Sequence, residues 1–270
     1  MKKHIIAMYD SGIGGLSIYN NLYSYIPNLR LIYIADRKNF PVGEKNVTEI
    51  KKYIFKIIDK LQELFIIDCL IIACNTASVA ALNSLRNKYA FPIIGTVPAV
   101  KVAAENTVTK KIGVIATTIT GKNNYLNNLI NDFAANCEVT IKCSQKLVRL
   151  AEEPWYYHQE REKILQQELI DFKKTDIDYL VIGCTHFSFL INDLQKILGP
   201  DIKIIDSVQG VSKQTIRILD KQNNKLCLKK EPREKNRFYY TGTLKCNHSA
   251  ILKRIITQIS NLTFSGCLLT

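Results

Sequence analysis

The stretch LIIACNTASVA, residues 70–80, is an apolar, β-rich run that stops at Cys74 and continues with small polar residues. The stretch LVIGCTHFSFL, residues 180–190, repeats this pattern 110 residues later, with Cys184 in the matching place. Short continuous apolar runs of this kind are typical of strands that are buried on both faces of a parallel sheet. The two stretches therefore predict two parallel-sheet regions, each with a cysteine at the end of a strand.

Around the first stretch, strand-like and helix-like segments alternate. Strands are expected at 4–9 and 29–36, a long amphipathic helix at 47–65, a helix from about 77 to 88 and a short strand in FPIIGTV, residues 91–97. This β-α-β-α order is typical of a mostly parallel sheet covered by helices.

The pattern restarts at KKIGVIATT, residues 110–118, with helices expected at roughly 121–136 and 158–174. The spacing from Asp10 to Cys74 is 64 residues, and the spacing from Thr117 to Cys184 is 67. We therefore expect two pseudo-symmetric, mostly parallel-sheet α/β domains with the active site in the cleft between them. The first would comprise residues 1–97 and 208–270, and the second 98–207. The final segments are expected to be a charged loop at 221–236, a strand at 238–242 that packs on the first half, and a helix at 247–260.

The composition narrows the class of protein. The 270 residues contain no apolar run near the ~20 residues that a membrane helix needs. Asp10 ends the first apolar run too early for a signal peptide. The eight cysteines include no CxxC pair, so neither a zinc ribbon nor a thioredoxin motif is indicated, and a cytoplasmic protein with reduced thiols is expected. The net charge of +13 is a weak indication of anionic partners such as nucleic acid.

The position of Cys74 and Cys184 suggests chemistry. Ligands of open α/β sheets bind beyond the carboxyl ends of the strands, and the N-terminus of a following helix favours a thiolate. A strand-end cysteine is often a core residue, but two matched sites with polar neighbours favour function. The other six cysteines lack such neighbours and are expected to be structural; Cys69, within the first strand region, is expected to serve packing.

Two thiols can invert a carbon stereocentre. The reaction needs a base on one face of the carbon and an acid on the other, and a thiolate and a thiol can exchange these roles. Because the Cα proton of an amino acid is far less acidic than a thiol, fixed dipoles and exclusion of water must stabilise a carbanion-like transition state.

Several motifs resemble those of the bacterial glutamate racemases, within the cofactor-independent aspartate/glutamate racemase superfamily. They run in the family's order over nearly the whole chain: DSGIGGLS (10–17), FPVGEK (40–45), ACNTAS (73–78), GTVPAVKVA (95–103), VIATTIT (114–120), LAE (150–152), GCTHF (183–187) and IDS (205–207).

The resemblance implies interconversion of L- and D-glutamate that supplies D-glutamate for peptidoglycan, with neither metal nor pyridoxal phosphate as cofactor. It implies Cys74 and Cys184 as the acid/base pair, acting on D- and L-glutamate respectively. Asp10 would assist Cys74, and His186 and Glu152 would assist Cys184, although Glu152 stands in a loop-like acidic pair with Glu153. The implied substrate-binding residues are Ser11, Val42, Gly43, Asn75, Thr76, Thr120 and Thr185.

Two departures from the family pattern stand out. Val42 replaces the usual tyrosine, which preserves a backbone contact but removes a ring and a hydroxyl. FSFL, residues 187–190, replaces a proline-containing continuation after His186, which affects the entry into the next helix more than the chemistry.

Alternatives stay open at this stage. Within the superfamily, an aspartate or broader amino-acid racemase is the nearest. Gly12, Gly14 and Asp36 imitate a dinucleotide-binding site, but Ser17 stands where a third glycine is needed. Cys184 and His186 could bind zinc together with Cys246 and His248. The resemblance also leaves open a homodimer or a monomer, activation by UDP-N-acetylmuramoyl-L-alanine, and binding of DNA gyrase.

Overall fold

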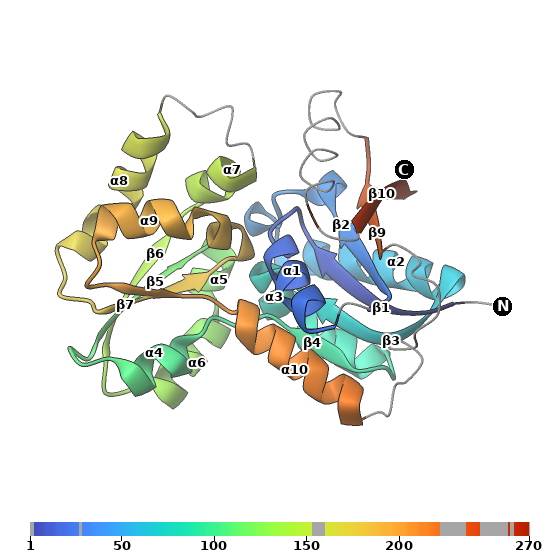
Figure 1. Cartoon of the computed structure of the whole chain (residues 1–270), viewed down its shortest axis with the longest axis horizontal. Coiled ribbons are helices and arrows are strands. Elements are labelled where there is room, and N and C mark those ends of the chain that lie inside the picture. The colour runs from blue at the N-terminus through green and yellow to red at the C-terminus, as the bar shows by residue number, and fades with distance from the viewer. Residues whose placement is uncertain are drawn as a thin grey trace. The chain divides into compact units, whose positions relative to one another are not determined.

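The computed structural model describes residues 3–26, 29–152, 160–221, 236–243, 259 and 262–269. The chain forms two compact units, of which unit 1 comprises residues 1–96 and 208–270 and unit 2 comprises residues 97–207. Figure 1 labels the elements of both. The expected charged loop at 221–236 and the expected last helix at 247–260 lie almost entirely outside the described residues.

Unit 1 contains a six-stranded sheet in the order β10-β9-β2-β1-β3-β4, and the pairs of neighbouring strands are parallel. Its elements are β1 (Lys3–Asp10), α1 (Leu16–Tyr25), β2 (Leu31–Ala35), η1 (Arg37–Asn39), η2 (Val42–Glu44), α2 (Val47–Leu64), β3 (Phe65–Ile72), α3 (Asn75–Lys88), β4 (Ile93–Gly95), α10 (Val208–Lys221), β9 (Asn236–Thr241) and β10 (Leu262–Leu269).

Helices cover both faces of this sheet. Figure 1 shows α1 and α10 on one face, and α2 and α3 on the other. Alternate side chains of β1 serve the two faces, and Ile6 and Met8 belong to the cluster that includes Leu16 and Tyr19 of α1. Strands that are buried on both faces account for the continuous apolar runs in the sequence.

The start of the long helix α2 is fixed by a local side-chain arrangement. Asn46 accepts a hydrogen bond from the Glu49 N–H at 2.9 Å, and the Asn46 N–H donates to the Glu49 carboxylate at 3.2 Å. This reciprocal pair is a capping box, which satisfies N–H groups that the first turn cannot pair internally. The helix then buries one apolar stripe, which includes Ile50, Ile54 and Ile58.

Unit 2 contains a four-stranded parallel sheet in the order β6-β5-β7-β8. Its elements are α4 (Val100–Asn106), β5 (Lys111–Ala116), α5 (Thr118–Lys122), α6 (Asn124–Phe133), β6 (Glu138–Cys143), α7 (Lys146–Glu152), α8 (Arg161–Lys173), β7 (Tyr179–Gly183), η3 (Thr185–Leu190), α9 (Ile191–Leu198) and β8 (Lys203–Ile205). Helices α4 and α6 share a core with one face of the sheet.

The strand orders of the two units correspond. In unit 1 the order β2-β1-β3-β4 follows the same path through the chain as β6-β5-β7-β8 in unit 2. Consequently β3, which leads to Cys74, and β7, which leads to Cys184, take equivalent inner positions. The expectation of an α/β protein with mostly parallel sheets is confirmed.

Some expected elements differ in detail. The single helix expected at 121–136 is two helices, because the Thr117 side chain caps α5 and the Asn123 side chain caps α6. The strands β6, β8 and β10 were not expected. The strand expected at 238–242 corresponds to β9, which pairs with β2 in the sheet of the first half as expected. Across the described ranges, no helix combines the length and the apolar character that crossing a membrane requires.

Candidate active site

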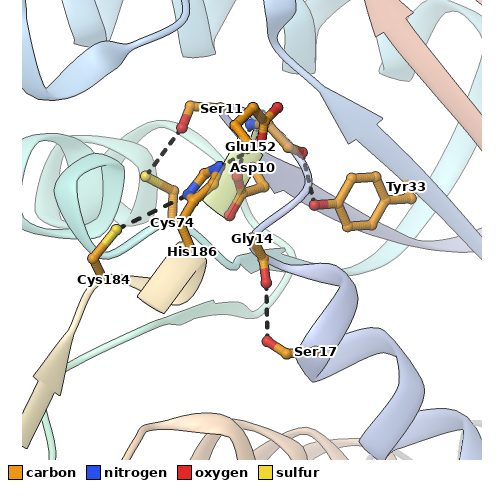
Figure 2. A network of polar contacts seen from close by, with 10 residues as sticks. Asp10, Ser11, Gly14, Ser17, Tyr33, Cys74, Glu152, Cys184 and His186 are labelled. Atoms are coloured by element: carbon orange, nitrogen blue, oxygen red, sulfur yellow. Dashed lines mark hydrogen bonds and ion pairs between the residues drawn. The ribbon is translucent and has the colours of Figure 1, made fainter. Parts of the chain in front are cut away.

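In unit 1 the thiol of Cys74 lies at the carboxyl edge of the sheet. Strand β3 ends at Ile72, and Cys74 is the N-cap residue of α3, so its side chain is close to the helix N-terminus. Only 5% of Cys74 is exposed. The Ser11 Oγ lies 3.7 Å from the Cys74 Sγ, and Figure 2 shows the hydroxyl directed at the sulfur. Both features favour negative charge on sulfur.

Asp10 and Ser11 reach this edge because β1 is the neighbour of β3 and ends there. The Gly12 N–H donates to Asp10 Oδ1 at 2.7 Å, and the Tyr33 hydroxyl donates to the Gly12 carbonyl at 2.9 Å. Figure 2 shows the second contact beside the turn. The turn is thus held from β1 and β2 together, which fixes where the fully buried Asp10 carboxylate lies.

Gly15 completes the turn before α1. A Cβ at this position would lie 2.6 Å from the Ala73 Cβ and 3.0 Å from the Tyr33 hydroxyl. The close approach of the turn to the residue before Cys74 therefore requires glycine here.

Four more expected residues of unit 1 belong to the same region. Asn75 and Thr76 form the first turn of α3 and are 2% exposed. Among the described residues, the Asn75 Nδ2 is a buried donor with no hydrogen-bond partner. Val42 and Gly43 are buried in η2, which packs against α3, so the valine keeps the segment next to the helix that Cys74 caps.

In unit 2 the thiol of Cys184 follows β7 and precedes the 3-10 helix η3. Its Sγ lies 3.9 Å from Nδ1 of His186, and Nε2 of His186 lies 2.9 Å from Oε2 of Glu152. Figure 2 shows the imidazole linking the thiol to the carboxylate. All three side chains are buried. The interpretation of Glu152 as part of a loop was wrong, because it is the last residue of α7 and packs toward η3.

The charge of this triad follows from its contacts. Burial on its own lowers the pKa of His186, but the Glu152 carboxylate and the hydrogen bonds with Cys184 and Glu152 outweigh it, so the net pKa lies well above the usual value. A protonated imidazole can donate to sulfur at one nitrogen and to the carboxylate at the other. The geometry thus places a hydrogen-bond donor on the Cys184 sulfur.

Thr120 and Thr185, the other expected residues of unit 2, lie at the same edge of its sheet because β5 and β7 are neighbours. Thr120 follows β5 in α5 and is fully buried, and the Thr117 hydroxyl donates to its Oγ1 at 3.1 Å. Thr185 is the first residue of η3. The sequence analysis did not name Thr117 as a candidate site residue. Its place directly after β5 would have identified it as a helix cap.

The remaining described cysteines have other surroundings. Cys69 lies within β3, and burial, aided by Asp68, raises the pKa of its thiol to about 12. Cys137 and Cys143 are half-buried, and Cys267 is exposed. All six described cysteines are free thiols. Two of them, Cys74 and Cys184, combine a strand-end position with a polar partner on the thiol.

The dinucleotide alternative fits this geometry poorly. The Asp10 carboxylate accepts the Gly12 N–H that a pyrophosphate would need. Asp36 accepts hydrogen bonds from the Tyr9 hydroxyl and the Asn39 amide, so its oxygens are engaged within the fold. Tyr9 was not expected to take part in the hydrogen bonding of Asp36. Burial, followed by the charge of Asp36, raises its pKa well above the usual value.

The zinc alternative concerns a different set of residues. In the described part of the chain, no group of three or more His, Cys, Asp or Glu side chains is arranged to hold a metal ion. Cys246 and His248, the second half of the suggested set, lie outside the described residues.

The fold and the side chains define a class: an α/β protein of two parallel-sheet units, each with a buried thiol after an inner strand. A sequence model of the Asp/Glu/hydantoin racemases matches residues 15–215. A glutamate racemase of Aliivibrio fischeri is 40% identical over 220 residues, which are 82% of this chain and 82% of that protein. The chain belongs to the Asp/Glu/hydantoin racemase family, as the motif resemblance implied.

Solved structures agree with this membership. A glutamate racemase of Escherichia coli, in complex with L-glutamate and the activator UDP-MurNAc-ala, is 28% identical with a TM-score of 0.88, covering 100% of this chain and 99% of that one. A glutamate racemase of Francisella tularensis in complex with D-glutamate is 28% identical with a TM-score of 0.80, covering 98% of each chain.

Proposed function

We propose that this protein is a glutamate racemase, an isomerase that interconverts L- and D-glutamate without a cofactor and supplies D-glutamate for peptidoglycan. The observation that carries the proposal is the pair of strand-end thiols with polar partners, Cys74 with Ser11 and Cys184 with His186. The similarity to glutamate racemases supports glutamate rather than aspartate as the substrate.

In the proposed reaction each unit supplies one thiol. The thiolate of one cysteine takes the Cα proton, which breaks the C–H bond and leaves the electron pair on a carbanion-like centre. The thiol of the other cysteine then gives its proton to the opposite face. The two sulfurs end with their protonation states exchanged, so the reverse reaction uses the same groups. We assign D-glutamate to Cys74 and L-glutamate to Cys184.

The neighbours of the thiols have proposed supporting roles. His186, held by Glu152, would donate a hydrogen bond to the Cys184 sulfur, and Asp10, held by the Gly12 N–H, would assist proton movement at Cys74. The buried Asn75 amide is a suitable donor to a substrate carboxylate, since burying an unused donor costs about 1–3 kcal/mol. Ser11, Thr76, Thr120 and Thr185 offer hydroxyls, and Val42 and Gly43 offer backbone groups.

The first test is a chiral assay of the purified protein with L-glutamate, D-glutamate and L-aspartate and no added cofactor. Racemisation of glutamate is expected from both directions, with Cα deuterium in the product when the buffer is D2O. Racemisation of aspartate alone would contradict the substrate assignment.

Replacement of either thiol tests the mechanism. Cys74→Ala and Cys184→Ala should each lower kcat by about 10²–10⁴-fold or more, because each removes an obligatory proton carrier. Cys267→Ser, a change at an exposed thiol, is the matched control and should keep full activity. Circular dichroism would show that the variants are folded. Full racemisation by either alanine variant would remove that thiol from the mechanism.

The proposal includes a cytoplasmic location, where thiols stay reduced, and D-glutamate supply to the cell wall. Growth of a D-glutamate auxotroph, restored by the wild type and not by Cys74→Ala, tests the cellular role. Addition of UDP-MurNAc-ala to the assay tests whether the activator bound by the E. coli enzyme acts here. A homodimer and gyrase binding stay predictions, measured by light scattering and by a supercoiling assay with Cys74→Ser.

A further inference from the structure

A pocket of unit 1 lies apart from Cys74, between α2 and the carboxyl ends of β2 and β9. It is a cavity of about 150 Å³. Its lining residues are Asp36, Lys38, Asn39, Lys52, Tyr53, Lys56, Ile57 and Thr241. Because a water occupies about 30 Å³ of liquid, the space suits a small ion or the head of a small molecule rather than a drug-sized ligand.

The floor of this cavity is a rigid polar network. The Thr241 hydroxyl donates to Asp36 Oδ1 at 2.5 Å and accepts from the Lys38 N–H at 3.1 Å. The Asn39 amide and the Tyr9 hydroxyl donate to the same carboxylate. Asp36 is fully buried and its oxygens are engaged by the fold. The network therefore fixes the start of η1, which carries Lys38, beside the cavity.

The walls carry an excess of positive charge. Lys38, Lys52 and Lys56 have no ion-pair partner within the described ranges, whereas Lys60 and Lys88 nearby pair with Glu63 and Asp59. Lys52 and Lys56 are four residues apart on α2, so they lie on one face of the helix and repel each other. Counting Asp36 as a carboxylate, the lining has a formal surplus of two positive charges.

We propose that this cavity binds a phosphate group, either as free orthophosphate or as the phosphoryl group of a small phosphomonoester. A phosphate carries a charge of about −1.5 to −2 at neutral pH, which matches the formal charge surplus of the lining residues. A carboxylate would leave part of the lysine charge uncompensated. The site would be separate from the racemase residues, and its occupation does not depend on the proposed reaction.

Isothermal titration of the purified protein tests this site, with orthophosphate in one arm and glycerol 3-phosphate in the other, at constant ionic strength. Saturable binding is expected, and the tighter of the two ligands identifies the source of the phosphate group. Lys52→Gln and Lys56→Gln should each weaken binding by about tenfold or more. Lys51→Gln is the matched control, because Lys51 lies on the same helix outside the cavity lining, and it should leave the affinity unchanged.

Absence of saturable binding of both ligands up to about 10 mM would overturn the proposal. Equal weakening by Lys51→Gln and Lys52→Gln would also overturn it, since that result reports net charge rather than a site. Binding of DNA with no binding of either small phosphate would assign the basic surface to a polyanion instead. The readout is binding, so none of these outcomes bears on racemisation.

Discussion

Cys74 and Cys184 are the same side chain in two different electrostatic settings. Cys74 has the Ser11 hydroxyl and the N-terminus of α3, both of which are uncharged groups with partial positive charge. Cys184 has His186, whose positive charge is sustained by Glu152. The polar partner of Cys184 is therefore itself a titrating group, and the proton that His186 holds can be measured through the pH dependence of stability.

Glu152→Gln should remove the dependence of folding stability on pH that His186 causes. Because the folded-state pKa of His186 is raised above its usual value near 6.5, the folded state binds more protons than the unfolded chain above that pH. The wild type should therefore lose stability as the pH rises from about 6.5 toward the raised pKa, by up to about 1.4 kcal/mol per pH unit. Without the carboxylate, burial lowers the pKa of His186, and this loss should disappear.

Urea unfolding at several pH values between about 6.5 and 9 measures the slope. Glu105→Gln, a change at an exposed carboxylate on α4, is the control and should keep the wild-type slope. A Glu152→Gln slope equal to that of the wild type would mean that His186 does not hold its extra proton through Glu152.

At the scale of elements, the turn between β1 and α1 positions Asp10 and Ser11 relative to Cys74. Gly15→Ala should destabilise the protein by about 1–3 kcal/mol, because the new Cβ would lie 2.6 Å from the Ala73 Cβ and the turn would have to move. Racemase activity should fall more than the fraction folded, since Asp10 and Ser11 would move with the turn.

Gly210→Ala is the matched control for this change. Gly210 lies exposed in α10, and nothing lies within 4 Å of a Cβ placed there. Alanine should therefore leave stability unchanged or raise it by up to about 1 kcal/mol, the difference in helix propensity. Thermal melting of both variants, with activity measured on the folded protein, makes the comparison. Equal behaviour of the two would show that the turn tolerates displacement.

The parallel sheets and both thiols could be predicted from the sequence, because continuous apolar strands and the polar residues after them are local patterns. The sequence analysis missed β10, since a strand's pairing partner depends on three-dimensional contacts. It also missed the split between α5 and α6, although the cap at Asn123 is a local contact with the Tyr125 N–H. Glu152 was expected at His186 only through the resemblance. Its burial at the end of α7 could not be derived from an acidic pair of residues.

At the scale of the molecule, unit 1 is built from both ends of the chain. Residues 208–270 return to the sheet that residues 1–96 begin, while residues 97–207 form unit 2. The contact between β9 and β2 is therefore made between segments about 200 residues apart in sequence, and the entropy of closing such a loop must be offset by specific interactions.

Asn236 supplies two of these interactions. The Leu31 N–H donates to its Oδ1 at 2.7 Å, and its Nδ2 donates to the Tyr19 hydroxyl at 2.9 Å. The side chain is 2% exposed and joins β9 to both β2 and α1. Burial raises the pKa of Tyr19 to about 12, and the hydrogen bond from Asn236 opposes that rise. The amide therefore connects the returning segment to the first core at a point that water does not reach.

Asn236→Ala should lower the free energy of unfolding of unit 1 substantially, because it leaves the Leu31 N–H and the Tyr19 hydroxyl buried without this partner, at about 1–3 kcal/mol each. Asn20→Ala, an exposed change on α1 beside Tyr19, should alter stability little. Hydrogen exchange of the β2 amides, followed with urea unfolding, separates local from global effects. Faster exchange confined to the Leu31 region would show release of β9 from β2, whereas wild-type exchange and stability in Asn236→Ala would contradict a role for this side chain in holding the returning segment.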